Sequence, residues 1–240
     1  MIDVESMKKN AWVLFLVASF FGLFGPSGLN YYWWFYSVFF VLFFAWTLYL
    51  IYGCERYVLF LATMILVGVA IFSFLASSLA YVSVSSYTAG ANMISIVGGL
   101  APILAVGAVL AIILLTKPSY FPFECKGNRV TVRRKEPGKK NYRIGLIAGA
   151  STLTGGIFLK SVDALTSNVV AIVGCTGCSI AILILLRHSI RGLRTLQVQE
   201  RSMSTPYTFM QIDEIREARS RWWLGRLFKR LASARHSPSA

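Results

Sequence analysis

YVLFLATMILVGVAIFSFLASSLAYVSVSSYTAGANMISIVGGLAPILAVGAVLAIILLT, residues 57–116, is a run of sixty residues without one Asp, Glu, Lys or Arg. A soluble core does not need so long a charge-free stretch, whereas two membrane-spanning helices with a short connection do. Only 14% of the whole chain is charged, against roughly a quarter in soluble domains. The sequence therefore predicts an integral membrane protein.

Working outward from this run, the chain shows apolar segments at residues 11–24, 31–52, 57–84, 94–116, 144–159 and 169–186. About 20 helical residues cross the roughly 30 Å of bilayer hydrocarbon. The segments at 11–24 and 144–159 are short and need flanking residues to complete a span. The pattern predicts an all-α polytopic membrane protein with about six transmembrane helices.

The basic residues indicate the orientation of these helices. With six spans and a cytoplasmic N-terminus, 23 of the 24 Lys and Arg residues lie on the cytoplasmic side, and Lys160 alone lies outside. Such a bias is what the positive-inside rule requires near span ends. We expect both termini to be cytoplasmic. The net charge of +14 could indicate a nucleic-acid-binding protein. The basic residues flank the apolar spans, however, which argues against that function.

One alternative concerns the first segment. Lys8 and Lys9 precede the apolar run AWVLFLVASFFGLF, which resembles a secretory signal peptide. The run lacks an Ala-x-Ala-like cleavage site, and Pro26-Ser27-Gly28 is typical of a turn between helices. We expect the segment to be retained as a helix.

This organisation divides the chain into four parts. Residues 1–116 form a membrane domain with the first four helices, and residues 117–143 form a basic cytoplasmic loop. Residues 144–186 supply the last two helices, and 187–240 form a basic cytoplasmic tail. In the loop, extended runs flank Lys126-Gly127-Asn128, which predicts a small β-hairpin. An isolated hairpin is marginal in water, so we expect it to pack against the protein, a partner or lipid headgroups.

The last two apolar segments contain small residues at helical spacing. A Cys-x-x-Cys pair in a soluble protein can be a redox or metal site, but a thiol within hydrocarbon is a poor nucleophile and structural zinc needs four ligands. Small residues instead let membrane helices approach closely. We therefore predict helix packing by Gly145, Gly149, Gly174, Cys175, Gly177 and Cys178. A pore lined by Ser151, Thr152 and Thr154 is the alternative for the fifth segment.

Few residues offer chemistry. Lys160 and Asp163 form a possible transport pair near the outer face, although a surface ion pair is the simpler interpretation. Cys54, Cys125 and His188 could meet at the cytoplasmic side as metal ligands, but they lack ligand spacing. The chain contains no motif of a nucleotide-binding loop, nucleophile elbow or zinc protease. We predict no catalytic residues, no metal and no cofactor.

The tail carries two further patterns. If the sixth helix continues past the membrane, Arg187, Arg191, Arg194 and Arg201 share one face, where they would contact anionic lipid headgroups or a partner. Farther on, Thr208 and Gln211 suggest a capping box, followed by acids in the first turn. An amphipathic helix is then predicted, lying in the membrane interface or docked on the protein itself. Its contact residues are Trp223, Leu227, Phe228, Lys229 and Arg230.

Between the two patterns, RSMSTP at residues 201–206 makes Ser204 a possible phosphosite in a eukaryotic cytosol. The sequence fits a bacterial inner membrane and a eukaryotic plasma membrane or endomembrane equally well. It favours a non-enzymatic protein that acts through contacts, as a scaffold, regulator, assembly factor or toxin-immunity partner. The alternatives are an oligomeric small-solute or ion transporter or channel, and a membrane-shaping or lipid-sensing protein. The expected partners are the bilayer, with anionic lipid on the cytoplasmic side, and a protein partner or second copy.

Overall fold

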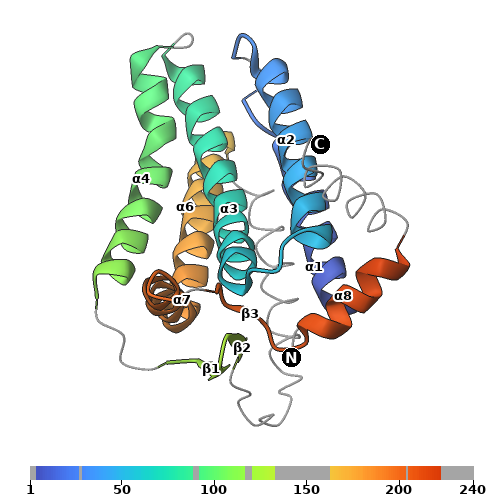
Figure 1. Ribbon diagram of the computed structural model, residues 1–240. Coiled ribbons are helices and arrows are strands. Elements are labelled where there is room, and N and C mark those ends of the chain that lie inside the picture. The colour runs from blue at the N-terminus through green and yellow to red at the C-terminus, as the bar shows by residue number, and fades with distance from the viewer. Residues whose placement is uncertain are drawn as a thin grey trace, which may run out of the picture.

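The computed structural model describes residues 4–26, 29–88, 92–116, 121–132, 163–203 and 205–222. These residues form long helices with a small three-stranded sheet at one end (Figure 1). We call this end the sheet end and the opposite end the far end. The elements are α1 (Val4–Gly22), α2 (Tyr32–Tyr52), α3 (Tyr57–Tyr87), α4 (Met93–Leu115), β1 (Phe123–Lys126), β2 (Arg129–Val132), α6 (Ala164–Leu185), α7 (Arg187–Glu200), β3 (Thr208–Phe209) and α8 (Ile212–Arg221).

Four of the described helices, α2, α3, α4 and α6, are long and apolar enough to cross a membrane. Their bounds overlap the predicted apolar segments, so the expectation of a mainly helical chain with apolar helices long enough to span a membrane is confirmed. The helix α1 packs along α2 and carries Glu5, Lys8 and Lys9 in its first two turns. It is not one of the four helices long and apolar enough to cross a membrane. The predicted segment at 144–159 lies outside the described residues.

The helices α1 to α4 alternate in direction, and α6 runs the same way as α4. Met7 near the start of α1, Leu50 near the end of α2 and Tyr57 at the start of α3 are buried in one cluster with residues of the sheet. Leu183 near the end of α6 shares a second cluster with Ile190 of α7. Consequently α1 and α3 begin at the sheet end, whereas α2 and α6 end there. Because α4 also ends beside α7, it runs the same way.

The predicted β-hairpin is present. The strands β1 and β2 pair antiparallel from Phe123↔Val132 to Lys126↔Arg129, and Gly127 adopts φ +61° in the turn. Glycine at the first central position suits a tight hairpin turn because it has no Cβ to clash. The tail supplies a third strand, β3, parallel to β2. The hairpin therefore packs against its own chain.

The sixth helix does not continue straight into the tail, which is the condition on which the shared arginine face was predicted. The helix α6 stops at Leu185, and α7 begins at Arg187 in a different direction: Figure 1 shows α6 from the side and α7 nearly end-on. The turn brings Ile190 into contact with the buried ends of α4 and α6. Burial of this apolar face against the membrane helices explains the break, because a straight helix would leave it in water.

The predicted capping box is also wrong. Thr208 belongs to β3, where its N–H donates to the carbonyl of Asn128 at 2.8 Å. Gln211 is the N-cap of α8 without a side-chain hydrogen bond, although Asp213 and Glu214 do lie in the first turn. The helix ends at Arg221, and Trp222 is extended with ψ 138°. The predicted amphipathic stretch from Trp223 onward lies outside the described residues.

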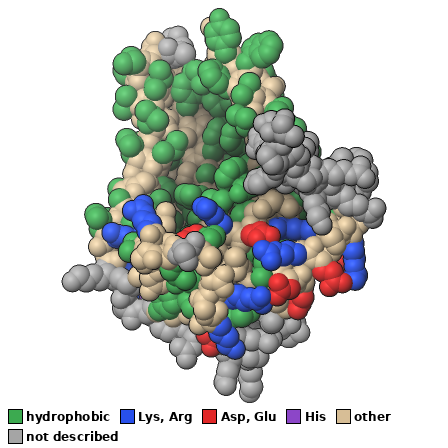
Figure 2. All heavy atoms as spheres, in the orientation of Figure 1, with side chains coloured by type: hydrophobic (Ala, Val, Ile, Leu, Met, Phe, Trp, Pro, Cys, Tyr) green, Lys and Arg blue, Asp and Glu red, His purple; other side chains and the backbone are tan. Residues whose placement is uncertain are grey.

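Charge divides the molecule into two zones. On the face drawn in Figure 2, acidic and basic side chains gather over the sheet end, whereas hydrophobic side chains cover the helices above them. At the far end, Tyr31, Trp33 and Trp34 are exposed, as aromatic residues at a membrane interface are. This division is the one expected of helices in lipid with a polar layer at one end.

Candidate functional site at the sheet end

The strands β1–β3 and the helices α7 and α8 form a folded layer, here called the sheet-end layer. Its core joins it to the ends of α1, α2 and α3. The buried members from the layer are Phe123, Val130, Leu193, Leu196, Tyr207, Phe209, Ile212 and Ile215. The ring of Tyr57 lies edge-on to Phe123 and Phe209, with ring centroids 5.9 and 5.4 Å apart. A buried aromatic cluster of this kind stabilises one fixed position of the layer on the helices.

The helix α8 is attached to the end of α2 by Arg219. This side chain is 6% exposed, and its Nε and Nη2 donate hydrogen bonds to the carbonyls of Ile51 and Cys54, each at 2.8 Å. The last carbonyls of a helix lack partners within the helix and carry partial negative charge. Arg219 supplies both the hydrogen bonds and the positive charge. Burial lowers the pKa of the guanidinium from its ordinary value, yet arginine remains charged at neutral pH.

Two ion pairs flank this contact. Arg216 donates to both carboxylate oxygens of Glu55 at 2.9 and 2.7 Å. This hydrogen-bonded pairing lowers the pKa of Glu55 below its ordinary value. Arg129 of β2 lies 2.8 Å from Asp213 of α8 and so connects the hairpin to the same helix. Both pairs are well exposed, so each contributes little to the free energy of folding and serves mainly to orient α8.

The helix α7 contacts the end of α4 in the same manner. The Nε of Arg191 donates to the carbonyl of Ile113 at 3.2 Å, and Arg194 donates to the carbonyl of Leu114. These are two of the arginines predicted to contact lipid headgroups. Both tail helices thus place arginines on the final carbonyls of a membrane helix, which is a favoured position for a cation.

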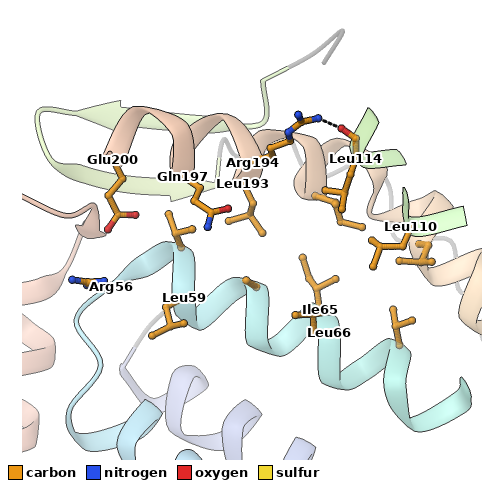
Figure 3. A pocket seen from close by; sticks show the side chains of 15 residues that line it. Arg56, Leu59, Ile65, Leu66, Leu110, Leu114, Leu193, Arg194, Gln197 and Glu200 are labelled. Carbon is orange, nitrogen blue, oxygen red and sulfur yellow. Dashed lines mark hydrogen bonds between the residues drawn. The ribbon is translucent and has the colours of Figure 1, made fainter. Parts of the chain in front are cut away.

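A cavity of about 340 Å³ lies between α3, α4, α6 and α7 (Figure 3). Its wall is mainly aliphatic, with Leu59, Ile65, Leu110 and Leu114 among the residues that line it. Polar side chains lie along α7 and at the start of α3: they are Arg56, Arg194, Gln197 and Glu200. The site therefore combines an apolar interior with a charged rim, and it can accept an amphiphilic ligand.

The remaining residues predicted for lipid contact are only partly placed. Arg187 is exposed at the start of α7, and Arg201 is the C-cap of the same helix. The predicted contacts at Trp223, Leu227, Phe228, Lys229 and Arg230 lie outside the described residues, as does Ser204. Trp222 has a clear role, because its ring packs edge-on against Tyr52 at 5.6 Å and lies 4.7 Å from the Lys8 ammonium.

The predicted packing residues of α6 form a face that the described residues leave largely open. Gly174, Gly177 and Cys178 are exposed, and Cys175 is half-buried. No described side chain lies within 4 Å of where a Cβ would stand on either glycine. On the opposite side, Ser179 is buried and bonds Ser73 of α3 at 3.2 Å. Gly145, Gly149, Ser151, Thr152 and Thr154 lie outside the described residues.

Asp163 is the N-cap of α6. Its carboxylate accepts hydrogen bonds from the N–H of Thr166 at 3.2 Å and from the Thr166 hydroxyl at 2.8 Å. These bonds lower the pKa of Asp163 from its ordinary value. Capping alone is a sufficient structural role for this carboxylate. Its predicted transport partner, Lys160, lies outside the described residues.

The three candidate metal ligands lie in different settings. Cys54 is buried at the end of α2, Cys125 is exposed on β1, and His188 is in α7. Burial raises the pKa of the Cys54 thiol, which disfavours the thiolate that would bind a metal. Within the ranges that the structure describes, no group of three or more His, Cys, Asp or Glu residues is arranged to hold a metal ion.

The contacts of Arg219, Arg216 and Glu55 escaped sequence reasoning. The available signal was weak: Cys54-Glu55-Arg56 is a short charged connection between two apolar helices, so the end of α2 needs outside donors for its carbonyls. Comparison of the chain with protein-family models, curated proteins and solved structures finds no match.

Proposed function

We propose that this chain is a non-enzymatic, multi-pass membrane protein that acts through contacts made by its sheet-end layer and by its membrane helices. The observation that carries the proposal is the attachment of the basic tail to α2 by the buried Arg219. A tail fixed in this way presents one defined surface, as recognition by a partner requires. It also couples the position of the membrane helices to the shape of that surface, which suits a regulator or assembly factor.

We further propose that the sheet end is cytoplasmic and that the chain crosses the membrane six times. The directions of the described helices support this. The chain leaves the sheet end at Val132 and is next described at Asp163, where α6 begins at the far end. With 22 residues, α6 is about 33 Å long at 1.5 Å per residue. Residues 144–159 supply the return crossing in this proposal.

The placement of charge supports the same orientation. Basic side chains gather over the sheet end on the face drawn in Figure 2, and the loop and tail hold 20 of the 24 Lys and Arg residues. Cytoplasmic loops carry such an excess.

The open face of α6 supports a protein contact inside the membrane. Gly174, Gly177 and Cys178 are small and exposed, and small residues allow close helix approach in lipid. A partner helix, from this chain or a second copy, would pack on this face with its backbone close to that of α6.

The proposal is tested with the full chain in its native membrane and in liposomes. A photo-crosslinking residue at Val173, which is 65% exposed beside this face, should give one discrete cross-linked product. The same residue at Leu104 of α4, which is 68% exposed, serves as the control and should give none. The purified chain in liposomes should move no ions or small solutes. Solute movement by the purified chain alone would overturn the proposal in favour of a transporter or channel.

A further inference from the structure

The cavity between α3 and α7 has an apolar interior that is open on one side. Val58, Val69 and Leu183 form part of its wall and are at most 8% exposed, whereas Leu66 is 57% exposed. Leu66 lies on α3, a helix long and apolar enough to cross the bilayer. The interior therefore lies beside a helix that can cross the bilayer, and an acyl chain would reach it from the lipid.

The rim of the cavity carries more positive than negative charge. Arg56 and Arg194 are cations, Glu200 is an acid and Gln197 is neutral. Figure 3 shows Arg56, Gln197 and Glu200 toward one end of the cavity, while Arg194 reaches the Leu114 carbonyl near the other. Among the described residues, no side chain forms a hydrogen bond or ion pair with the Arg56 guanidinium. Arg194 retains N–H groups beyond the one bonded to Leu114.

The Arg56 guanidinium offers one positive charge to a single phosphodiester. Arginine binds phosphate oxygens through paired N–H groups, and Gln197 and Glu200 can hydrogen-bond headgroup hydroxyls. Basic pockets between membrane helices at the cytoplasmic side are suited to anionic lipid headgroups. The volume of about 340 Å³ is within the range of roughly 300 to 1,000 Å³ found for ligand sites.

A larger cavity of about 560 Å³ lies between the α1–α2 pair and α3. Its wall is aromatic and aliphatic, from residues such as Phe21, Phe39 and Trp46, and it contains no ionisable group except the phenols of Tyr32 and Tyr36. It therefore has nothing that would select a headgroup. Of these two cavities, the smaller has the charged side chains that could bind a headgroup.

We propose that this cavity binds one anionic glycerophospholipid of the sheet-end leaflet, with an acyl chain along Leu59, Ile65 and Leu110 and the phosphate on Arg56. The lipid fills the space between α3 and α7. It thereby joins a membrane helix to the sheet-end layer and makes the position of α7 sensitive to lipid composition. This site is separate from general attraction of the tail to an anionic surface, because it depends on Arg56, a residue outside the tail.

The experiment uses the full chain in detergent, titrated with phosphatidylglycerol, phosphatidylethanolamine or phosphatidylcholine and observed by native mass spectrometry. One phosphatidylglycerol molecule should be retained per chain. Arg56→Gln should weaken that binding about tenfold, as loss of a charge-assisted hydrogen bond does. Lys9→Gln removes the same charge from an exposed position at the sheet end and should leave binding unchanged. Ala62→Trp, which fills the interior, should abolish it.

Thermal unfolding of each variant separates lost binding from lost structure. Arg56 is exposed and its side chain bonds no described residue, so Arg56→Gln should unfold at the wild-type temperature and remains informative if Ala62→Trp does not fold. Equal weakening by Arg56→Gln and Lys9→Gln would overturn the proposal, because it would indicate surface attraction only. Equal retention of phosphatidylethanolamine and phosphatidylglycerol would overturn the assignment of an anionic headgroup.

Discussion

The Arg219 guanidinium donates a 2.8 Å hydrogen bond to the carbonyl of Ile51 across 168 residues of chain. This contact joins α8 to the end of α2, and the neighbouring bond to Cys54 extends it. A basic tail is often regarded as a set of charges that fixes topology. Here one of those charges is buried and has a structural role, which makes the tail part of the fold.

The first prediction concerns Arg219→Met, which keeps the apolar stem and removes the guanidinium. The carbonyls of Ile51 in α2 and of Cys54 just after it lose their donor, and bonds to a charged group contribute about 1.5 to 3 kcal/mol each. We expect docking of the tail to weaken by about 3 kcal/mol. Chymotryptic cleavage after Tyr207 and Phe209, which are buried, should accelerate roughly a hundredfold.

The control for this prediction is Arg129→Met, which breaks the exposed pair with Asp213. Exposed ion pairs contribute about 1 kcal/mol or less, so cleavage should change only several-fold. Equal cleavage rates in the Arg219 variant and the wild type would show that α8 is held by other contacts.

The second prediction is a pH dependence from Glu55. Pairing with Arg216 lowers the folded-state pKa of this carboxyl, so the pair contributes stability above the unfolded-state value of about 4.3. That contribution is lost as the pH falls through the folded-state pKa. Because Glu55 and Arg216 are 40% and 57% exposed, we expect a loss of about 1 kcal/mol at most.

Spin labels at Lys9 in α1 and Ser220 in α8, both exposed, report the docking of α8. The measurement is the distribution of distances between the two labels. The distribution should be constant between pH 7 and pH 5, given the direction of the shift, and should broaden below about pH 4. Glu55→Gln should remove most of the pH dependence. An unchanged response in that variant would assign the effect to other carboxylates.

The third prediction concerns Gly192, where α7 lies against the start of β1. A Cβ at this position would stand 2.7 Å from Phe123 Cε2 and 2.9 Å from Pro122 Cδ. Gly192→Ala should therefore separate α7 from the hairpin, at a cost of about 1 to 3 kcal/mol. Thermal unfolding of the purified chain measures the cost.

Gly107→Ala in α4 is the matched control, because no described atom lies within 4 Å of its Cβ position. It should leave the unfolding temperature unchanged or raise it slightly, since alanine favours helix. If both glycine variants were destabilised equally, close packing at Gly192 would not be the cause.

The fourth prediction treats Cys175 and Cys178 as packing residues. The double substitution of both cysteines by alanine should preserve folding, oligomeric state and the cross-link expected from Val173. Oxidant and reductant should have the same effect on this variant as on the wild type. Loss of the cross-link only on oxidation of the wild type would instead identify a redox function.

Local pattern was enough to predict the membrane helices and the hairpin. The charge-free run that contains α3 and α4 is typical of membrane-spanning helices and not of a soluble protein. The pair Gly127-Asn128 between two extended runs is typical of a tight hairpin turn. The turn is predicted from two neighbouring residues, and the helices are predicted from the composition of one continuous segment. They therefore do not depend on which other parts of the chain are near.

The sheet-end layer depends on contacts between distant segments, which local pattern does not contain. The strand β3 has two residues and exists because Thr208 finds the Asn128 carbonyl. Thr208 satisfies the rule for a capping residue equally well, so the sequence favoured the wrong element. In the same way, the spacing of Arg191 and Arg194 predicts a shared face but does not distinguish lipid phosphate from the carbonyls of Ile113 and Leu114.

The sidedness of the sheet end tests the central claim most directly. In a variant without the four native cysteines, single cysteines are placed at Lys126 in the hairpin, Glu217 in α8 and Asn92 at the far end. A membrane-impermeant maleimide is applied to sealed vesicles of each orientation. We predict that positions 126 and 217 react only from the cytoplasmic side and position 92 only from the opposite side. Reaction of positions 126 and 217 from opposite sides would contradict a tail folded onto the hairpin and the helix ends.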